Sequence, residues 1–247
     1  LRFAYVPGKP VLHDVSAFFP AGTMTAIVGE SGSGKSTLVD LIARFYHCPK
    51  GSIFIDGVDV HEFDLRSLHD GMTIASQDVW LLNRSLRDNL RFGLRKEASD
   101  TELLRVLGAV GLTDLLERLP EGLATEVGDR GVRLSGGERQ RLALARGLLR
   151  EPKVIILDEA TAALDSVTEQ RVKKEIAGFA RGRTVIAIAH RLSTITMASR
   201  IFVMKEGRIV ERGTWSELLA LGGEFKRLYD AQQGAPLTVT SAPVELA

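Results

Sequence analysis

A glycine-rich stretch, GESGSGKST at residues 29–37, carries the residue types that bind phosphate. It fits the pattern G-x-x-x-x-G-K-[ST], in which backbone N–H groups surround phosphate oxygens. An apolar segment, MTAIV at 24–28, precedes it, and helical spacing of apolar residues begins near Lys35. We therefore expect Lys35 to bind the outer phosphates of a nucleotide and Ser36 to ligate Mg²⁺. The predicted nucleotide-binding residues of this loop are Gly29, Glu30, Ser31, Gly32, Ser33, Gly34, Lys35, Ser36 and Thr37.

Acidic and imidazole side chains follow two later apolar segments. Asp158 and Glu159 end VIILDE at 154–159, and His190 ends TVIAIAH at 184–190. Ligands collect at the carboxyl ends of parallel strands, so these side chains are expected to face the phosphates. Asp158 is predicted to join the Mg²⁺ shell, Glu159 to act as the general base for an attacking water, and His190 to hydrogen-bond the terminal phosphate. The combination indicates hydrolysis of a nucleotide.

A second glycine-containing stretch, LSGGE at 134–138, indicates another anion contact. Ser135 and Glu138 have the spacing of a capping box, which predicts a helix start. Gly136 and Gly137 fall in the first turn, where backbone without side chains lets an anion approach exposed N–H groups. From the local pattern alone, close packing of this helix against a neighbour explains the two glycines equally well.

The elements that position these groups alternate between strand and helix patterns, which indicates an α/β fold. Short apolar segments predict strands at 1–5, 11–19, 24–28, 51–60, 72–77, 154–157 and 184–189. Helical spacing predicts a helix from about 35, a crossover helix at 166–180 and a helix at 214–233 that begins with a Thr214–Glu217 capping box. It also predicts a helical insertion from about 83 to 150, within which Ser99 and Glu102 have the spacing of a capping box. Residues 200–213 are predicted to form a hairpin.

Composition narrows the class of protein. The 247 residues are 45% hydrophobic and carry a formal net charge of +1, which gives no long-range field typical of a nucleic-acid-binding protein. Cys48 is the one cysteine, so an intrachain disulfide is excluded and a reducing cytosol fits. No apolar run approaches the length of a membrane span, and the first ten residues lack the pattern of a signal peptide. The start at Leu1, inside a predicted strand, indicates a domain of a longer polypeptide.

The order of these motifs resembles that of the nucleotide-binding domains of ATP-binding cassette (ABC) transporters, over residues 1–233. GESGSGKS resembles the Walker A motif, LSGGE the signature, VIILDE the Walker B motif, and His190 the switch histidine. Three further positions gain a role from the resemblance. Gln77 in ASQDVWLL is similar to the Q-loop glutamine, Asp165 in ALD to the D-loop aspartate, and Tyr5 in FAY to the aromatic residue that stacks on adenine.

The resemblance implies a P-loop NTPase fold with a RecA-like parallel sheet, an N-terminal antiparallel β subdomain and an inserted helical subdomain. The ATP-binding core is then expected at 1–82 and 151–233, the helical subdomain at 83–150, and a flexible tail at 234–247. The implied cofactors are ATP and Mg²⁺, with Ser36, Gln77 and Asp158 at the metal. In this family two domains pair head to tail around two ATP molecules. The signature residues Ser135, Gly136, Gly137 and Glu138 are then expected to contact the partner's nucleotide, and Asp165 is also expected to be a nucleotide-binding residue.

Two stretches favour the exporter type over the importer type, TEVGDRG at 125–131 and LLNRSLRDNLRFG at 81–93. An importer subunit and a non-transport ABC ATPase remain the alternatives, although no heptad-rich insertion typical of chromosome-organising members is present. The sequence departs from common family residues at Ser76, Asp129, Glu138 and Ala162, and none of these removes a catalytic group.

The partners implied are a second nucleotide-binding domain and a transmembrane domain in the same full-length chain, at the cytoplasmic face of the inner or plasma membrane. An intact set of motifs favours a homodimer, and a heterodimer stays open. No nucleic-acid partner is expected, and the transported molecule is not encoded in this segment.

Overall fold

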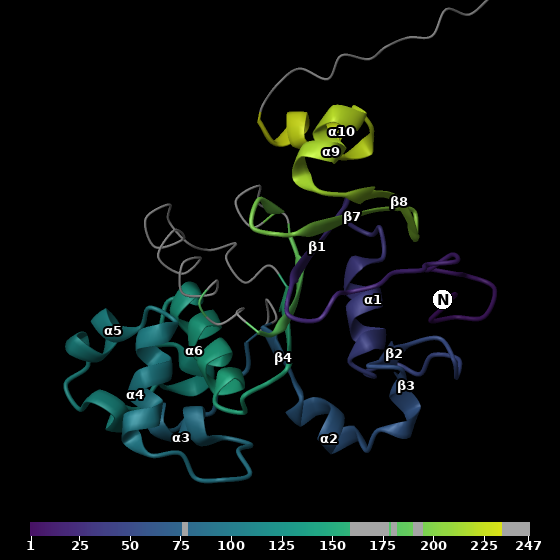
Figure 1. Ribbon diagram of the computed structural model, residues 1–247. Helices are drawn as coiled ribbons and strands as arrows, with labels where there is room; N and C mark the ends of the chain where they lie inside the picture. The colour runs from purple at the N-terminus through teal and green to yellow at the C-terminus, as the bar shows by residue number, and fades with distance from the viewer. Residues whose placement is uncertain (76–78, 159–177, 179–181, 190–194, 234–247) are drawn as a thin grey trace, which may run out of the picture.

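One mixed six-stranded sheet forms the centre of the chain (Figure 1). The computed structural model describes residues 1–75, 79–158, 178, 182–189 and 195–233. The strand order is β4 (Met72–Ala75), β5 (Val154–Asp158), β6 (Thr184–Ile188), β1 (Met24–Val28), β7 (Arg200–Lys205) and β8 (Arg208–Gly213). All neighbouring strands pair in parallel except β7 and β8, which form the predicted antiparallel hairpin. The predicted α/β fold with a parallel sheet is confirmed.

The inner strands are apolar on both faces because helices cover both sides of the sheet. Along β1, Ala26 and Val28 pack into one hydrophobic cluster, while Ile27 between them packs into another. The first cluster includes residues of α6 (Gly136–Leu148), and the second includes residues of α1 (Lys35–Ile42). The helices α1 and α6 therefore lie on opposite faces of the sheet.

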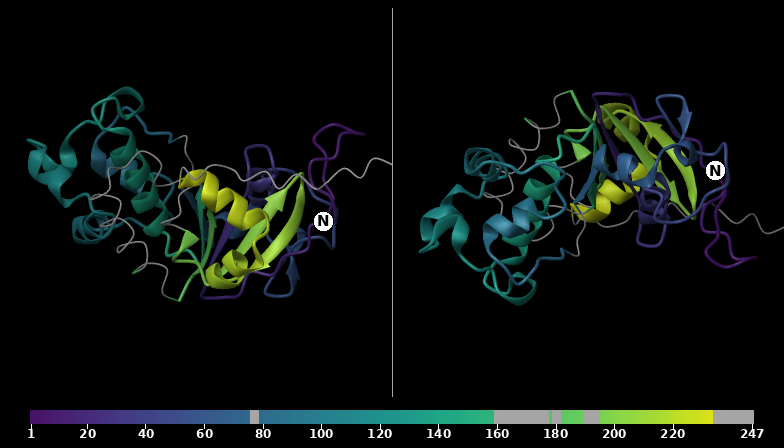
Figure 2. Two further views of the ribbon diagram at one scale, coloured as in Figure 1. Left: turned by 90° about the horizontal axis from the view of Figure 1, so that it is seen from above. Right: turned by 90° about the horizontal axis from the view of Figure 1, so that it is seen from below.

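Four helices gather beyond β4, at the opposite end of the sheet from β8 (Figures 1 and 2). They are α3 (Leu86–Arg91), α4 (Asp100–Ala109), α5 (Thr113–Arg118) and α6, with 3₁₀ turns at Gly122–Ala124 and Asp129–Gly131. These elements fall within the stretch predicted to be a helical insertion. The boundaries of that unit at 83 and 150 stay a prediction.

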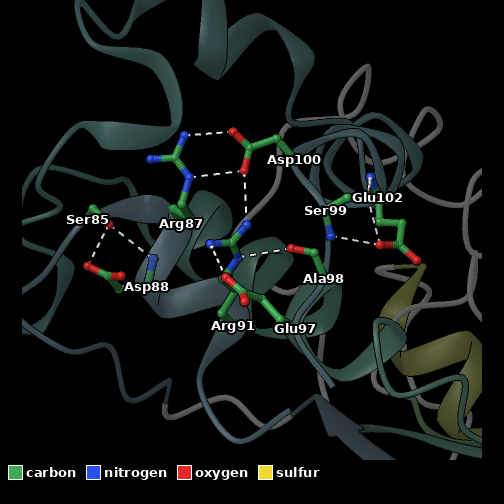
Figure 3. A network of polar contacts seen from close by, with 9 residues as sticks. All are labelled: Ser85, Arg87, Asp88, Arg91, Glu97, Ala98, Ser99, Asp100 and Glu102. Carbon is green, nitrogen blue, oxygen red and sulfur yellow. Dashed lines mark hydrogen bonds and ion pairs between the residues drawn. The ribbon is translucent and has the colours of Figure 1, made fainter. Parts of the chain in front are cut away.

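A network of ion pairs joins α3 to the start of α4 (Figure 3). The Arg87 guanidinium donates to both carboxylate oxygens of Asp100, at 3.0 and 2.7 Å. Arg91 also contacts Asp100 and donates to the backbone oxygen of Ala98 at 3.0 Å. The Ser99 side chain caps α4, as its capping-box spacing predicts. Asp100 and Glu102 of the capping box place negative charge at the positive end of the α4 dipole, which stabilises the helix start.

The N-terminal region is less regular than the sequence predicts. Residues 1–12 form isolated antiparallel bridges, Phe3 with Leu12 and Val6 with Lys9, and Leu1 exchanges two backbone hydrogen bonds with Val15. Pro7 and Pro10 lie between these positions and have no N–H to donate, which limits the ladder. The strands expected at 1–5 and 11–19 are therefore wrong as continuous strands, although the pairing is antiparallel as expected. A short hairpin of β2 (Phe54–Ile55) and β3 (Val58–Asp59) follows, then a 3₁₀ turn at Val60–Glu62 and α2 (Leu65–Asp70).

The C-terminal segment forms two helices where one was predicted. The capping box at Thr214 begins α9 (Trp215–Leu221), but the helix ends at Gly222, whose φ of 68° is left-handed. A second helix, α10 (Glu224–Gln232), starts two residues later. Two successive glycines favour such a stop because a left-handed C-cap costs glycine little. The predicted single helix over 214–233 is therefore wrong.

The predicted crossover helix at 166–180 and the predicted tail at 234–247 lie outside the described residues, except for Gly178. Among the helices that the structure does describe, none combines the length and hydropathy needed to cross a membrane.

Two helical glycines give a matched test of the packing between α6 and β4. A Cβ at Gly147 of α6 would lie 2.1 Å from Thr73 Oγ1, whereas the nearest atom to a Cβ at Gly108 of α4 is 3.8 Å away. We expect Gly147→Ala to lower the free energy of unfolding by about 1–3 kcal/mol through overpacking. Gly108→Ala should raise it by about 0.5–1 kcal/mol because alanine favours the helix. Urea denaturation of both variants checks this, and a change of the same sign in both would contradict the described packing.

Candidate nucleotide-binding site

Three parallel strands bring the predicted site to one edge of the sheet. Ile188 of β6 pairs with Ile27 of β1 on one side and with Asp158 of β5 on the other. With neighbouring strands about 4.8 Å apart, the backbone of Asp158 lies about 10 Å from that of Ile27. The glycine-rich loop follows β1 directly, so Asp158 and the loop share the carboxyl edge of the sheet. This is where ligands bind in open α/β sheets.

The glycine-rich loop curls around the Lys35 side chain. The Lys35 ammonium donates to the backbone oxygens of Gly29 at 2.9 Å and Glu30 at 2.7 Å, and to Ser33 Oγ at 3.4 Å. Lys35 is only 5% exposed. A buried ammonium must be surrounded by acceptors, and here the loop supplies them. The loop is thereby held in a turn with a positive charge at its centre.

Two glycines of the loop are required by the backbone around them. A Cβ at Gly29 would lie 2.2 Å from the backbone oxygen of Met204 on β7. Gly34 has a left-handed φ of 98°, and a Cβ there would meet the Leu12 side chain at 2.7 Å. Gly29 lets the loop leave the sheet beside β7, and Gly34 lets the chain turn directly into α1.

The first turn of α1 has the chemistry of a phosphate site. Its N-cap is Gly34, which has no side chain to accept from the first-turn amides, whereas Ser85, Ser99, Ser135 and Thr214 cap their own helices. The Ser36 hydroxyl is on an exposed residue of this turn. This helix start has no capping side chain, carries Lys35 and the Ser36 hydroxyl, and shares the carboxyl edge of the sheet with Asp158. Such a combination fits a nucleoside triphosphate with Mg²⁺.

Tyr5 lies against the same helix as part of an aromatic cluster. Its hydroxyl donates to Thr37 Oγ1 at 3.1 Å, and its ring packs edge to face on Phe3 and Tyr46 at 4.9 and 4.8 Å between centroids. Tyr5 is 45% exposed and Tyr46 is 47% exposed. An apolar, half-exposed face next to the phosphate loop is a suitable platform for a base.

The LSGGE segment forms the predicted capped helix start. Ser135 Oγ accepts from the Glu138 N–H at 3.3 Å, and Glu138 accepts from the Ser135 N–H at 2.8 Å. Gly136 and Gly137 open α6, and the Ser135 side chain is on an exposed residue. Burial alone would raise the pKa of Glu138, but hydrogen bonds from Ser135 and Arg118 outweigh it and lower that pKa. Glu138 therefore remains charged beside the start of α6.

Within this chain the two glycine segments are not brought together. The loop leads into α1 on one face of the sheet, and LSGGE leads into α6 on the other. The remaining predicted site residues, Gln77, Glu159, Asp165 and His190, lie outside the described residues. The structure does describe the segments that lead to three of them. β4 ends at Ala75, β5 at Asp158, and buried Ala189 follows β6.

Sequence reasoning missed three residues that contact the predicted site. Tyr46 packs on Tyr5, Arg118 pairs with Glu138, and Arg227 of α10 pairs with Glu30. Arg118 and Glu138 are 20 residues apart, and Arg227 and Glu30 are 197 apart. No local spacing signals contacts at such separations, so only the tertiary structure reveals them.

Comparison with known proteins agrees with these motifs. The family model described as ABC transporter matches residues 12–162. The heterocyst differentiation ATP-binding protein HepA of Nostoc sp. (strain PCC 7120) is 48% identical over 230 residues, covering 93% of this chain and 38% of the relative. The ATP-dependent lipid A-core flippase of Methylobacillus flagellatus is 46% identical over 224 residues, covering 91% of this chain and 38% of the relative.

A solved structure extends the likeness to the fold. A bacterial Atm1-family ABC exporter with ATP bound superposes with a TM-score of 0.89 at 41% identity, covering 96% of this chain and 41% of that one. The chain thus spans about two fifths of the length of these similar proteins. With its phosphate loop, its signature helix and these likenesses together, the chain belongs to the ABC transporter family.

Proposed function

We propose that this domain binds Mg²⁺-ATP at the glycine-rich loop and hydrolyses it in a head-to-tail pair with a second such domain. The observation that carries the proposal is the start of α1. This helix begins at a glycine with no capping side chain and next to a buried lysine, and only β6 separates the strand that leads to it from β5, which ends at Asp158.

Each side chain of the site has a chemical role in the proposal. Lys35 donates to phosphate oxygens, while the Ser36 hydroxyl, Gln77 and the Asp158 carboxylate hold Mg²⁺. The loop residues 29–37 bind the phosphates through backbone N–H groups, and Tyr5 packs against the base. Bound ATP supplies the phosphoryl group, and Mg²⁺ neutralises part of its charge.

Hydrolysis needs a base and a group that senses the terminal phosphate. Glu159 follows Asp158 directly and is assigned as the base that takes a proton from the attacking water. His190, two residues after β6, is assigned a hydrogen bond to the terminal phosphate. The parallel register of β5, β6 and β1 supports both assignments because it directs the three chain exits toward one edge.

The signature segment requires a second chain in this proposal. Ser135, Gly136, Gly137 and Glu138 begin a helix on the face of the sheet opposite α1, so they cannot complete the site of their own chain. A head-to-tail pair brings the signature of each chain, with Asp165, to the loop of the other. Two copies of this chain suffice because its motifs are intact, and ATP holds the closed pair until hydrolysis releases it.

The domain is proposed to serve an exporter whose transmembrane part belongs to the same longer polypeptide. The likeness to exporter proteins more than twice the length of this chain supports that arrangement. The domain then works at the cytoplasmic face of the membrane, where pairing and release drive the transport cycle.

Replacement of Lys35 tests nucleotide binding. Lys35→Ala should weaken ATP binding about tenfold or more because a charge-assisted hydrogen bond to phosphate is lost. Titration calorimetry with Mg²⁺-ATP measures this, with circular dichroism to verify the fold. Lys50→Ala, at an exposed lysine away from the loop, serves as the control and should bind as the unaltered chain does. Equal affinity in Lys35→Ala would refute the assigned role.

Mixing two inactive variants tests the shared site. Ser135→Arg blocks the signature and Glu159→Gln removes the base, so each variant alone should lack turnover. In a mixed pair, one site combines an intact loop and base with an intact signature. When equal amounts are mixed, half of the pairs contain one chain of each variant, and each such pair has one working site out of two. The mixture should therefore regain about a quarter of the normal ATPase rate.

The control for this mixing is a single chain that carries both substitutions, added to either variant. A working site needs an unaltered Glu159 from one chain and an unaltered Ser135 from the other. No pair in either control mixture provides both, so both mixtures should stay inactive. An inactive mixture of Ser135→Arg with Glu159→Gln, with pairing verified by light scattering, would show that the signature does not act across the pair.

A further inference from the structure

The C-terminal helix α10 packs directly behind the phosphate loop. Phe225 and Leu228 of α10 line a small cavity together with Gly29 and Ala189, which follow β1 and β6. Phe225 is 1% exposed and belongs to the same hydrophobic cluster as Val28. α10 thus contacts the two strand ends that lead to the loop and to His190.

α10 is fixed in place independently of the loop. The Glu211 carboxylate on β8 accepts from the backbone N–H groups of Glu224 and Phe225, at 2.9 Å for the latter. This carboxylate stands at the positive end of the helix dipole, where its charge is stabilising. A side chain projecting from α10 therefore has a rigid base on the sheet.

A chain of alternating charges runs from β7 through α10 to the loop. Lys205 donates to Glu224 at 3.0 Å, Arg227 Nε donates to Glu224 at 3.1 Å, and Arg227 Nη2 donates to Glu30 Oε1 at 2.5 Å. Two positive and two negative side chains make the chain neutral overall. Without Arg227, one negative charge would be left uncompensated at the loop.

Glu30 occupies a sensitive position. It is the second residue of the phosphate-binding loop, and its backbone oxygen accepts from the Lys35 ammonium. An uncompensated carboxylate here repels the phosphates that the loop is proposed to bind, because like charges nearby disfavour each other. The Glu30 side chain is 60% exposed even in its ion pair with Arg227, so its charge lies at the surface of the loop and needs a cation beside it to be compensated.

We propose that Arg227 is a positioning residue for ATP. It neutralises the Glu30 carboxylate and holds it against α10, away from the phosphates. This inference rests on the proposed binding of ATP at the loop and adds a contribution of the C-terminal helix to the affinity of that site.

The test is a double-mutant cycle in Mg²⁺-ATP binding and in ATPase kinetics. Arg227→Ala should weaken ATP binding and raise KM about twofold to fivefold, as expected for a partly exposed charge, while kcat changes little. Arg227→Lys should retain most of the affinity. Adding Glu30→Gln to Arg227→Ala should restore the affinity, because the charge that Arg227 compensates is then gone. A purely structural role of the ion pair predicts instead that Glu30→Gln gives no restoration.

The matched control is Lys226→Ala, on the same helix, whose ion pair with Asp230 does not involve the loop. It should leave KM unchanged. If Arg227→Ala unfolds the chain, Arg227→Gln removes the charge and keeps a long side chain. Unchanged KM in a folded charge-removing variant, or no restoration by Glu30→Gln, would overturn the proposal. If the unaltered chain binds ATP and Lys35→Ala weakens that binding as expected, the proposed function stands whatever the Arg227 variants show.

Discussion

The burial of one ammonium group shapes the site. Lys35 is nearly inaccessible to solvent, and two backbone oxygens and a hydroxyl of the preceding loop surround its charge. Such a charge is stable only when acceptors converge on it, so the loop must curl, and it must do so over a few residues between β1 and α1. The glycines at 29 and 34 permit this curl against Met204 and Leu12. The same curl leaves the first turn of α1 uncapped and facing the carboxyl edge of the sheet.

The sheet itself separates the two anion-binding segments. Alternate residues of β1, β5 and β6 pack toward α1 on one face and toward α6 on the other. A single chain cannot fold its signature helix onto its own loop without breaking those layers. In our proposal, two chains each supply one of the two glycine segments to a shared site. The third element near the loop, α10, reaches it from behind through Arg227.

Local patterns predicted much of this arrangement. The phosphate loop, the capping boxes at Ser99, Ser135 and Thr214, and the β7–β8 hairpin each depend on residues a few positions apart, so their spacing was sufficient. The strands expected at 1–5 and 11–19 were overpredicted because the prediction followed their apolar residues and gave too little weight to Pro7 and Pro10, which cannot donate to a strand ladder. The helix at 214–233 was overextended because its periodicity continues across Gly222. The pairing of Arg227 with Glu30, and the packing of Tyr46 on Tyr5, depend on tertiary contacts that no local pattern encodes.

The solution mass of Glu159→Gln, measured by light scattering with and without Mg²⁺-ATP, distinguishes a site shared between two chains from one that is complete in a single chain. A site shared between two chains predicts a monomer without nucleotide and a dimer with it, because bound ATP cannot be hydrolysed and holds the pair closed. The same chain with Ser135→Arg added should stay monomeric in both conditions. A Glu159→Gln chain that binds ATP yet remains a monomer would contradict a site shared between two chains. A dimer that forms without nucleotide and persists when Ser135→Arg is added would contradict it as well.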